Sequence, residues 1–223
     1  MNKHFSTRRT SGFTLIELLV VISLILVASS IIISSGGGGT GAKLSTAQRV
    51  VSGIAQGARG QAILKGSETR LIIYSEKNSV GEPDKKLRFL GIVYQVTERD
   101  PSDGSVTKFW KAATQGTYLP EGIYFDPVLS DLKSDVKWSE SDRTMSLDYP
   151  RRDMVEDGTG SEEFYYYEFN SNGTMAADTE NSWLVFRSGT LKPNESGDLT
   201  VSFPKAGEEG ESLRSALIFR RVG

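Results

Sequence analysis

Residues 11–35 read SGFTLIELLVVISLILVASSIIISS, and this stretch decides how the N-terminal part of the chain folds. From Phe13 to Ser35 the only charged residue is Glu17. An α-helix rises about 1.5 Å per residue, so this stretch is long enough to cross the roughly 30 Å hydrocarbon core of a bilayer. The pattern therefore predicts a membrane-spanning helix at residues 13–35.

The residues before this helix are basic. Lys3, Arg8 and Arg9 lie in the first twelve residues, which contain no acid. Positive charge on the near side predicts that the N-terminus stays in the cytoplasm and the rest of the chain lies outside. A cleaved secretory signal has an apolar region of only about 7–15 residues. The longer run here favours a retained anchor over an ordinary signal peptide.

Glu17 is unexpected in a membrane helix. A charged side chain at the centre of such a helix costs about 2.5–3.5 kcal/mol, so it indicates a functional role. If the chain were cut between Gly12 and Phe13, the new α-amino group would lie four residues before Glu17, about one helical turn. That ammonium group can pair with the carboxylate of the same chain or of a neighbouring copy.

The order Gly12-Phe13-Thr14-Leu15-Ile16-Glu17, between a short basic leader and an apolar helix, resembles the processing motif of type IV prepilins and type II secretion pseudopilins. The resemblance implies that prepilin peptidase cuts the bond between Gly12 and Phe13 and methylates Phe13. It also implies that Glu17 pairs with the N-terminus of an adjacent subunit during assembly. An ordinary membrane anchor or signal peptide is the alternative.

The fold class that this resemblance implies is α+β. A pilin-like long N-terminal helix, with a membrane-embedded half and an amphipathic half, would pack on a β-rich C-terminal headgroup. The expected divisions are a cleaved leader (1–12), a transmembrane or filament-core helix (13–35), a glycine-rich hinge (36–41), an amphipathic helix (42–66) and a periplasmic headgroup (67–223).

The hinge and the amphipathic helix rest on local composition. Gly36 to Gly39 are consecutive and Gly41 follows, and each glycine costs about 1 kcal/mol in a helix, so we expect the helix to loosen or break here. The break would serve as a flexible linker or let the anchor and headgroup reorient. Apolar residues then recur at intervals near three and four, as in an amphipathic helix: Leu44, Ala47, Val50, Val51, Ile54, Ala58, Ala62 and Ile63.

The remainder of the chain predicts strands separated by turns. The turn residues from Asp100 to Gly104 predict a hairpin between the strands on either side. The polar segment 130–160 is expected to be mostly loop, with one strand at most. The expected strands are 69–75, 87–98, 106–112, 163–170, 182–187, 198–203 and 215–221. The segment 117–126 also belongs to the β-rich part, with a turn at 119–122 before the strand residues 123–125.

A second resemblance covers the headgroup. The segments LPEGIYF (119–125), YEFNSNGTM (167–175) and WLVFRSGTL (183–191) are similar to H-type minor pseudopilins and to the related T-type minor pilins. This implies a minor subunit whose helix packs against β-sheets. The insertions at 80–86 and 130–160 depart from a compact headgroup of that kind, so other pseudopilin types stay open.

Several kinds of chemistry are excluded or disfavoured. The chain has no cysteine, and its one histidine, His4, lies in the leader, so the headgroup has no disulfide, thiolate site or histidine-based triad. No feature selects a pair of catalytic carboxylates. We therefore expect no catalytic residue, metal or cofactor, and no enzymatic activity. Two acidic groups are interpreted as solvated surface rather than calcium sites: Asp126, Asp131, Asp135, Glu140 and Asp142, and Asp153, Glu156 and Asp157.

The charge balance also bears on partners. Beyond the first twelve residues the chain has 23 Lys and Arg against 28 Asp and Glu, a net charge of −5. Nucleic-acid binding depends on neutralising phosphates, so this balance makes it an unlikely function. The exception we weigh is DNA binding by Arg214, Arg220 and Arg221, because T-type minor pilins can bind DNA through arginines near the chain end.

Three local patterns in the headgroup predict ordinary structure. Tyr165, Tyr166 and Tyr167 should alternate between the two faces of a strand. The sequences Asn172-Gly-Thr174 and Asn194-Glu-Ser196 match the glycosylation pattern but are interpreted as turns.

Together these observations predict a structural subunit with no enzymatic role. It would be anchored in the bacterial inner membrane, processed, and assembled through Phe13–Ile33 into a periplasmic pseudopilus of a type II secretion-like system. Its expected partners are prepilin peptidase, other pilin or pseudopilin subunits and membrane lipid. The alternative is a minor pilin of a type IV pilus, with a role in adhesion or DNA uptake.

Overall fold

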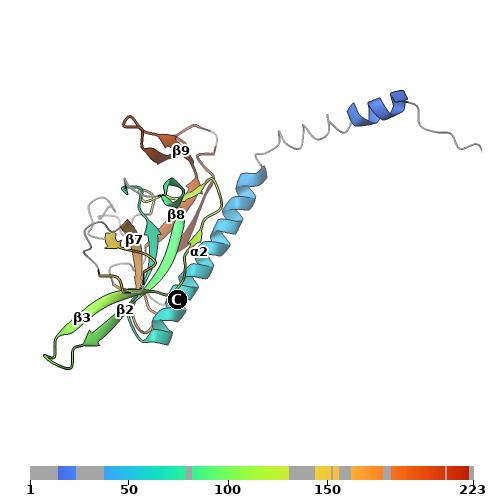
Figure 1. Ribbon diagram of the computed structural model, residues 1–223. Helices are drawn as coiled ribbons and strands as arrows, with labels where there is room; N and C mark the ends of the chain where they lie inside the picture. The colour runs from blue at the N-terminus through green and yellow to red at the C-terminus, as the bar shows by residue number, and fades with distance from the viewer. Residues whose placement is uncertain are drawn as a thin grey trace, which may run out of the picture. The chain divides into compact units, whose positions relative to one another are not determined.

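The computed structural model describes residues 15–23, 38–78, 82–130, 144–151, 153–155, 162–177, 182–208 and 210–220. The chain divides into two units, Met1–Gly39 and Thr40–Gly223. In the first unit the described residues are helical, at residues 15–23 and at the start of helix α2 (Gly38–Lys65). The second unit contains the rest of α2 and all of the strands (Figure 1). An α+β fold is therefore confirmed, with a β-rich C-terminal part.

Helix α2 spans Gly38–Lys65. Residues 38–41 of the predicted glycine-rich hinge are helical, while residues 36 and 37 lie outside the described residues, so the hinge stays a prediction. Helix formation is cooperative, so a long helix can extend through glycines whose individual penalties are about 1 kcal/mol. The amphipathic helix consequently begins four residues earlier than residue 42.

The C-terminal end of α2 has a specific stop signal. Gly66 has a left-handed backbone with φ of +61°, and the N–H of Ser67 donates to the carbonyl oxygen of Ala62 at 3.3 Å. This is the bond that closes a Schellman motif, and glycine is favoured at its left-handed position. The helix therefore ends within one residue of the predicted boundary.

The main sheet of the second unit is antiparallel, and all its strands are joined by hydrogen bonds. Five strands follow one another in the order β3 (Val106–Ala112), β2 (Phe89–Arg99), β1 (Thr69–Tyr74), β7 (Glu162–Phe169) and β6 (Thr144–Leu147). A sixth strand, β4 (Thr117–Tyr118), pairs with β2 outside this order.

Two smaller β elements complete the unit. A second sheet has the order β11 (Arg214–Ile218), β8 (Trp183–Ser188) and β5 (Ile123–Phe125). Strands β9 (Thr190–Pro193) and β10 (Leu199–Ser202) form a two-stranded ribbon. One turn of 3₁₀ helix, η1, covers Pro83–Lys85.

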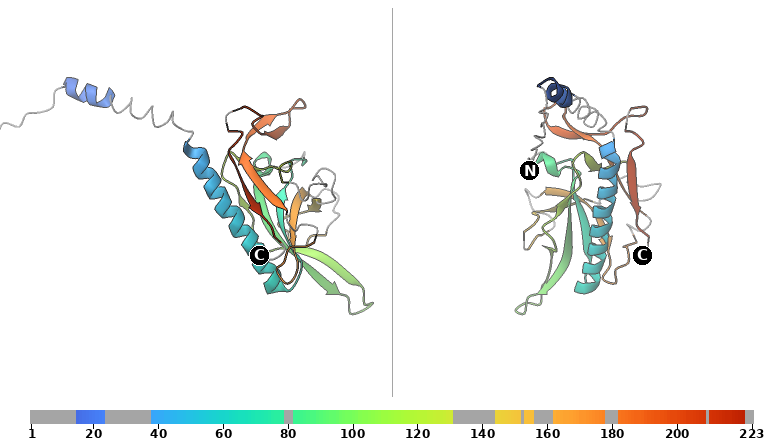
Figure 2. Two further views of the ribbon diagram at one scale, coloured as in Figure 1. Left: turned by 180° about the vertical axis from the view of Figure 1, so that it is seen from behind. Right: turned by 90° about the vertical axis from the view of Figure 1, so that its right-hand side faces the viewer.

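The main sheet is buried on both faces, as β1 shows. Leu71 and Ile73 contribute to one hydrophobic cluster, and Ile72 and Tyr74 contribute to another. Since successive strand residues point to opposite faces, the two clusters lie on opposite sides of the sheet. The first cluster joins α2, the main sheet and the second sheet, and Figure 2 shows α2 running along the sheets. The second cluster includes Leu147 and Met154, from the chain around β6.

α2 meets the first cluster through a narrow face of mainly small residues. Its fully buried positions follow the predicted helical spacing, but Val50 and Ile54 are only half-buried and Ile63 is exposed. A helix that buries alanines can approach a sheet closely. The buried positions are Leu44, Ala47, Val51, Ala55, Ala58 and Ala62.

Most of the predicted strands are present. The hairpin prediction is confirmed, because β2 and β3 pair in register from Val93–Ala112 to Arg99–Val106. Every residue from 97 to 108 is exposed, and the hairpin extends as an arm in Figure 1. The single strand allowed in the polar segment is β6, and β9 was not predicted.

The alternation of the three tyrosines is also confirmed. Tyr165 and Tyr167 lie in the first cluster, whereas Tyr166 packs against the second. On that second face, the guanidinium of Arg70 lies 4.0 Å from the ring centre of Tyr166 and 4.4 Å from that of Trp110. Arg70 also bonds Glu168 at 2.7 Å, so this face carries a stacked and paired cation.

Candidate functional site

The residues that the sequence singles out for processing and assembly are Gly12 and Phe13, which precede the helical residues 15–23 in the sequence, and Glu17, which is one of them. Gly12 and Phe13 lie outside the described residues, and so do residues 24–37. Cleavage between Gly12 and Phe13 and methylation of Phe13 therefore stay predictions. Glu17 is described, and it lies within the helical residues 15–23.

The helix exposes apolar side chains on all sides. Every residue from 15 to 23 is exposed, and exposed fractions run from 48% at Val21 to 82% at Leu15 among the apolar ones. A helix that is apolar all round is stable only when lipid or protein covers it. Glu17 is the only ionisable side chain among these residues. The described residues thus place one carboxylate among exposed apolar side chains that require a covering environment.

The described helices do not include one that is both apolar and long enough to cross a membrane. The described part of the predicted span covers residues 15–23 only.

The acidic groups of the headgroup are placed differently from the prediction. Asp126 is fully buried, so its assignment to a solvated surface is wrong. Its carboxylate forms an ion pair with Arg187 at 2.5 Å, and the burial of this pair depends on β8, which sequence proximity does not reveal. Asp153 is exposed and pairs with Lys111 at 3.5 Å. The other members lie outside the described residues: Asp131, Asp135, Glu140, Asp142, Glu156 and Asp157.

Among the described residues, no three His, Cys, Asp or Glu side chains gather in a way that could hold a metal ion. Glu76, in the turn after β1, has a carboxylate whose pKa is shifted by its surroundings. Burial raises its pKa above the ordinary value, while the hydroxyl of Tyr165 donates to it at 3.0 Å and opposes the shift. Burial likewise raises the pKa of Tyr165. Among the described residues, Glu76 and Tyr165 thus share a partly buried hydrogen bond and do not form a constellation with a nucleophile or a base.

The arginines weighed for DNA binding are divided along the chain end. Arg214 begins β11 and pairs in register with Arg187, and Arg220 follows the strand; both are exposed. Arg221 lies outside the described residues.

Both glycosylation-like sequences are turns, as predicted. The side-chain oxygen of Asn172 accepts the N–H of Thr174 at 3.0 Å, and that of Asn194 accepts the N–H of Ser196 at 2.9 Å. Local side-chain to backbone bonds of this kind are what favour asparagine in turns.

Comparison with known proteins bears on the N-terminal segment. A family model described as the prokaryotic N-terminal methylation motif matches residues 7–33. The match includes Gly12, Phe13 and Glu17, and it supports a protein of the type IV pilin and pseudopilin class that prepilin peptidase processes. Proteins with this motif are structural subunits. Neither a curated protein nor a solved structure matches the chain.

The sequence thus identified the N-terminal residues from a linear motif, which the family model also recognises. It missed the buried pair of Asp126 and Arg187 and the stacked Arg70, because neither leaves a local signal.

Proposed function

We propose that this protein is a pseudopilin subunit, anchored in the inner membrane, that assembles into a periplasmic pseudopilus of a type II secretion-like system. The observation that carries the proposal is the methylation motif at residues 7–33, with Glu17 on an exposed apolar helix. In this proposal prepilin peptidase removes residues 1–12 and methylates the amino group of Phe13. The subunit then leaves the membrane for the filament.

The proposed mechanism is assembly, with no catalytic step. Residues 13–33 form the filament core, where apolar helices of neighbouring subunits replace lipid around one another. The carboxylate of Glu17 pairs with the N-terminal ammonium of an adjacent subunit, and the pair is stronger there than in water because the core has a low dielectric constant. The β-rich headgroup makes the remaining subunit contacts, and we propose a minor, H-type role for it.

The first experiment tests processing. The full chain is produced in membranes with and without prepilin peptidase, and the intact mass and the N-terminal sequence are determined. We expect a chain that begins at Phe13 and carries one methyl group. Gly12→Ala should slow or stop the cut, whereas the neighbouring Ser11→Ala should leave it intact. A cut downstream of Ser35 would contradict the proposal.

The second experiment tests assembly. Glu17→Val should still be cleaved, but its amount in sheared filament fractions should fall well below that of the unaltered chain. Leu18→Val is the matched control, because it changes a neighbouring side chain and keeps the carboxylate. Entry of both variants at the unaltered level would refute the pairing role of Glu17. Co-fractionation with secretin components favours secretion, whereas association with a retractable surface pilus favours the minor pilin alternative.

A further inference from the structure

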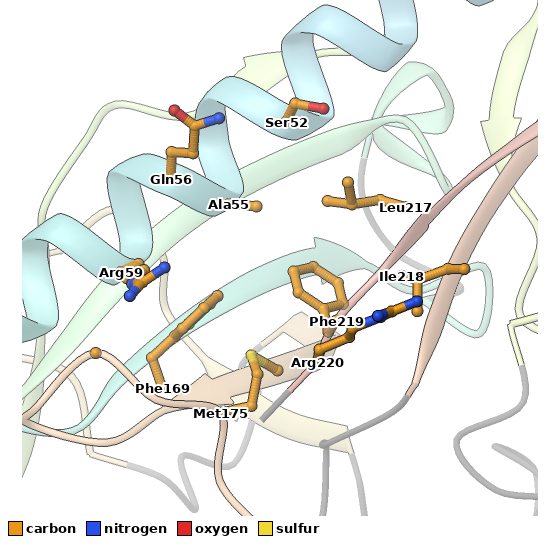
Figure 3. A pocket seen from close by; sticks show the side chains of 11 residues that line it. Ser52, Ala55, Gln56, Arg59, Phe169, Met175, Leu217, Ile218, Phe219 and Arg220 are labelled. Carbon is orange, nitrogen blue, oxygen red and sulfur yellow. The ribbon is translucent and has the colours of Figure 1, made fainter. Parts of the chain in front are cut away.

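A groove of about 180 Å³ lies between α2 and β11 (Figure 3). Ser52, Gln56 and Arg59 of α2 line one side. Leu217 and Ile218, at the end of β11, and the next two residues, Phe219 and Arg220, line the other. Phe169 and Met175 lie between these two sides, so the floor of the groove is apolar.

The groove follows the free edge of a strand. Four consecutive residues, 217–220, line it, although alternate side chains of a strand point to opposite faces. A surface that meets all four must therefore wrap around an edge of β11. The strand order β11-β8-β5 places β8 on the other edge, so the groove runs along the unpaired one.

The hydrogen-bond register shows which backbone groups are available there. The N–H of Phe219 donates to the carbonyl oxygen of Ser182 at 2.9 Å, towards β8. In an antiparallel ladder the direction alternates, so Ala216 and Ile218 direct their N–H and C=O away from β8. Within the described part of the chain, these backbone groups form no hydrogen bond. The side chain of Ile218 is 48% exposed beside them.

The groove carries positive charge on both of its sides. Arg59 and Arg220 are exposed and lie on its two sides, with Phe169 and Phe219 between them in Figure 3. Neither arginine takes part in an ion pair among the described residues. Two cations around an apolar floor favour an acidic and partly apolar ligand, and this local charge is opposite to the negative net charge of the chain.

We propose that this edge binds an extended segment of a partner polypeptide by strand addition. The partner backbone pairs with Ala216 and Ile218, its acidic side chain meets Arg59 and Arg220, and a neighbouring apolar side chain contacts Phe169 and Phe219. In strand addition, main-chain hydrogen bonds supply affinity and alternate side chains supply selectivity. The inference concerns the headgroup alone and does not require the proposed function.

The test uses the absence of cysteine from the chain. Gln56→Cys places one thiol in the groove of the full chain, held in detergent micelles. Three synthetic peptides carry an N-terminal cysteine: CGTVDVEVT (acidic), CGTVKVKVT (basic) and CGTVDPEVT (acidic, with a central proline). The fraction of protein joined to each peptide is measured at equilibrium in a glutathione buffer by intact mass. Tethering raises the effective concentration, so weak binding is detectable.

We expect the acidic peptide to be captured roughly 5-fold more than the basic one, as one or two exposed charge pairs allow. Arg59→Ala combined with Arg220→Ala should remove that difference. The fraction of protein joined to the proline peptide should fall to the background level, because proline lacks the N–H that strand pairing needs. Background is set by Gln48→Cys, an exposed position of α2 outside the groove.

Ala216→Pro tests the protein side of the pairing. Its N–H points away from β8, so proline there should block the partner while leaving the β11–β8 ladder in place. If circular dichroism shows that this variant is unfolded, backbone pairing is tested instead on the protein that keeps Ala216, by comparing capture of the acidic peptide with capture of the proline peptide. Equal capture of the acidic and basic peptides, or equal capture of the acidic and proline peptides, would overturn the proposal.

Discussion

The carboxylate of Asp126, just after β5, lies 2.5 Å from the guanidinium of Arg187 on β8. Asp126 is fully buried, and the side chain of Arg187 is 16% exposed. The other carboxylate oxygen accepts the N–H groups of Val128 and Leu129, each at 3.0 Å. Arg187 in turn lies 4.4 Å from the ring centre of Phe203. One buried acid therefore joins the second sheet to the chain that leaves it.

Asp126→Ala should reduce the free energy of unfolding by about 3–5 kcal/mol, because it leaves a buried guanidinium without its partner. Urea unfolding followed by circular dichroism measures the change. The matched control is Asp153→Ala, whose partner Lys111 lies 3.5 Å away and whose own side chain is 60% exposed. An exposed pair contributes about 0–1 kcal/mol. Similar small losses in both variants would mean that burial of the Asp126 pair adds nothing.

Glu76→Gln should make the headgroup more stable than the unaltered chain, and this difference should grow as the pH rises. Burial raises the pKa of Glu76 above 4.5 in the folded protein. Between pH 4.5 and the folded pKa, Glu76 is therefore mostly ionised in the unfolded chain and still mostly protonated in the folded one. The stability contributed by the protonated group is therefore complete below pH 4.5 and is lost as the pH rises through the folded pKa. Glutamine stays neutral, so the advantage of the variant should be larger at pH 7 than at pH 4.5.

Urea unfolding at the two pH values measures this difference. Glu68→Gln is the control, because Glu68 is exposed and its removal changes the net charge by the same amount. A Glu76→Gln variant whose stability ran parallel to that of the unaltered chain at both pH values would show that Glu76 ionises freely.

Ala58→Leu should test how closely α2 approaches the sheets. Ala58 is fully buried, and inserting a larger side chain into a packed core costs about 1–3 kcal/mol. Gln48→Leu makes a comparable addition at an exposed position of the same helix, where substitutions usually change stability by about 0.5 kcal/mol or less. Thermal unfolding compares the two variants, and equal melting temperatures would contradict the close approach.

Gly116→Ala should be more harmful than Gly104→Ala. Both glycines have left-handed backbones, with φ of +83° and +75°, so alanine costs about 1–2 kcal/mol at either position. A Cβ at Gly116 would also overlap the ring of Phe89, whereas one at Gly104 meets open space. We expect the lower melting temperature for Gly116→Ala, and the reverse order would exclude the overlap as the dominant cause.

Patterns that reside in neighbouring residues were predictable. The hairpin around Asp100 and Gly104 follows from turn residues between two apolar runs, and the methylation motif is a linear signal that an enzyme reads along the chain. The stop at Gly66 agrees with a predicted boundary for the same reason. Alternation also assigned Tyr166 to the face opposite Tyr165.

Features that depend on distant residues were not predictable. Asp126 resembles any loop acid until β8 brings Arg187 beside it. The glycines at 38–41 read as a break, yet the cooperative helix after them includes them. Strand β9 is short and mostly exposed, so it lacks the apolar alternation that identifies a half-buried strand. The groove beside β11 is formed by α2 and β11, which lie far apart in the sequence.

The stop at Gly66 has a mechanical consequence. Only residues 66–68 separate α2 from β1, and β1 lies in the interior of the main sheet, with β2 and β7 on its two sides. A pulling force on α2 therefore enters the headgroup at a strand held by two neighbours, in a register of five residue pairs with β2 and six with β7. Tension is shared between both ladders, so the headgroup resists extraction by its helix better than it would if α2 continued into an edge strand.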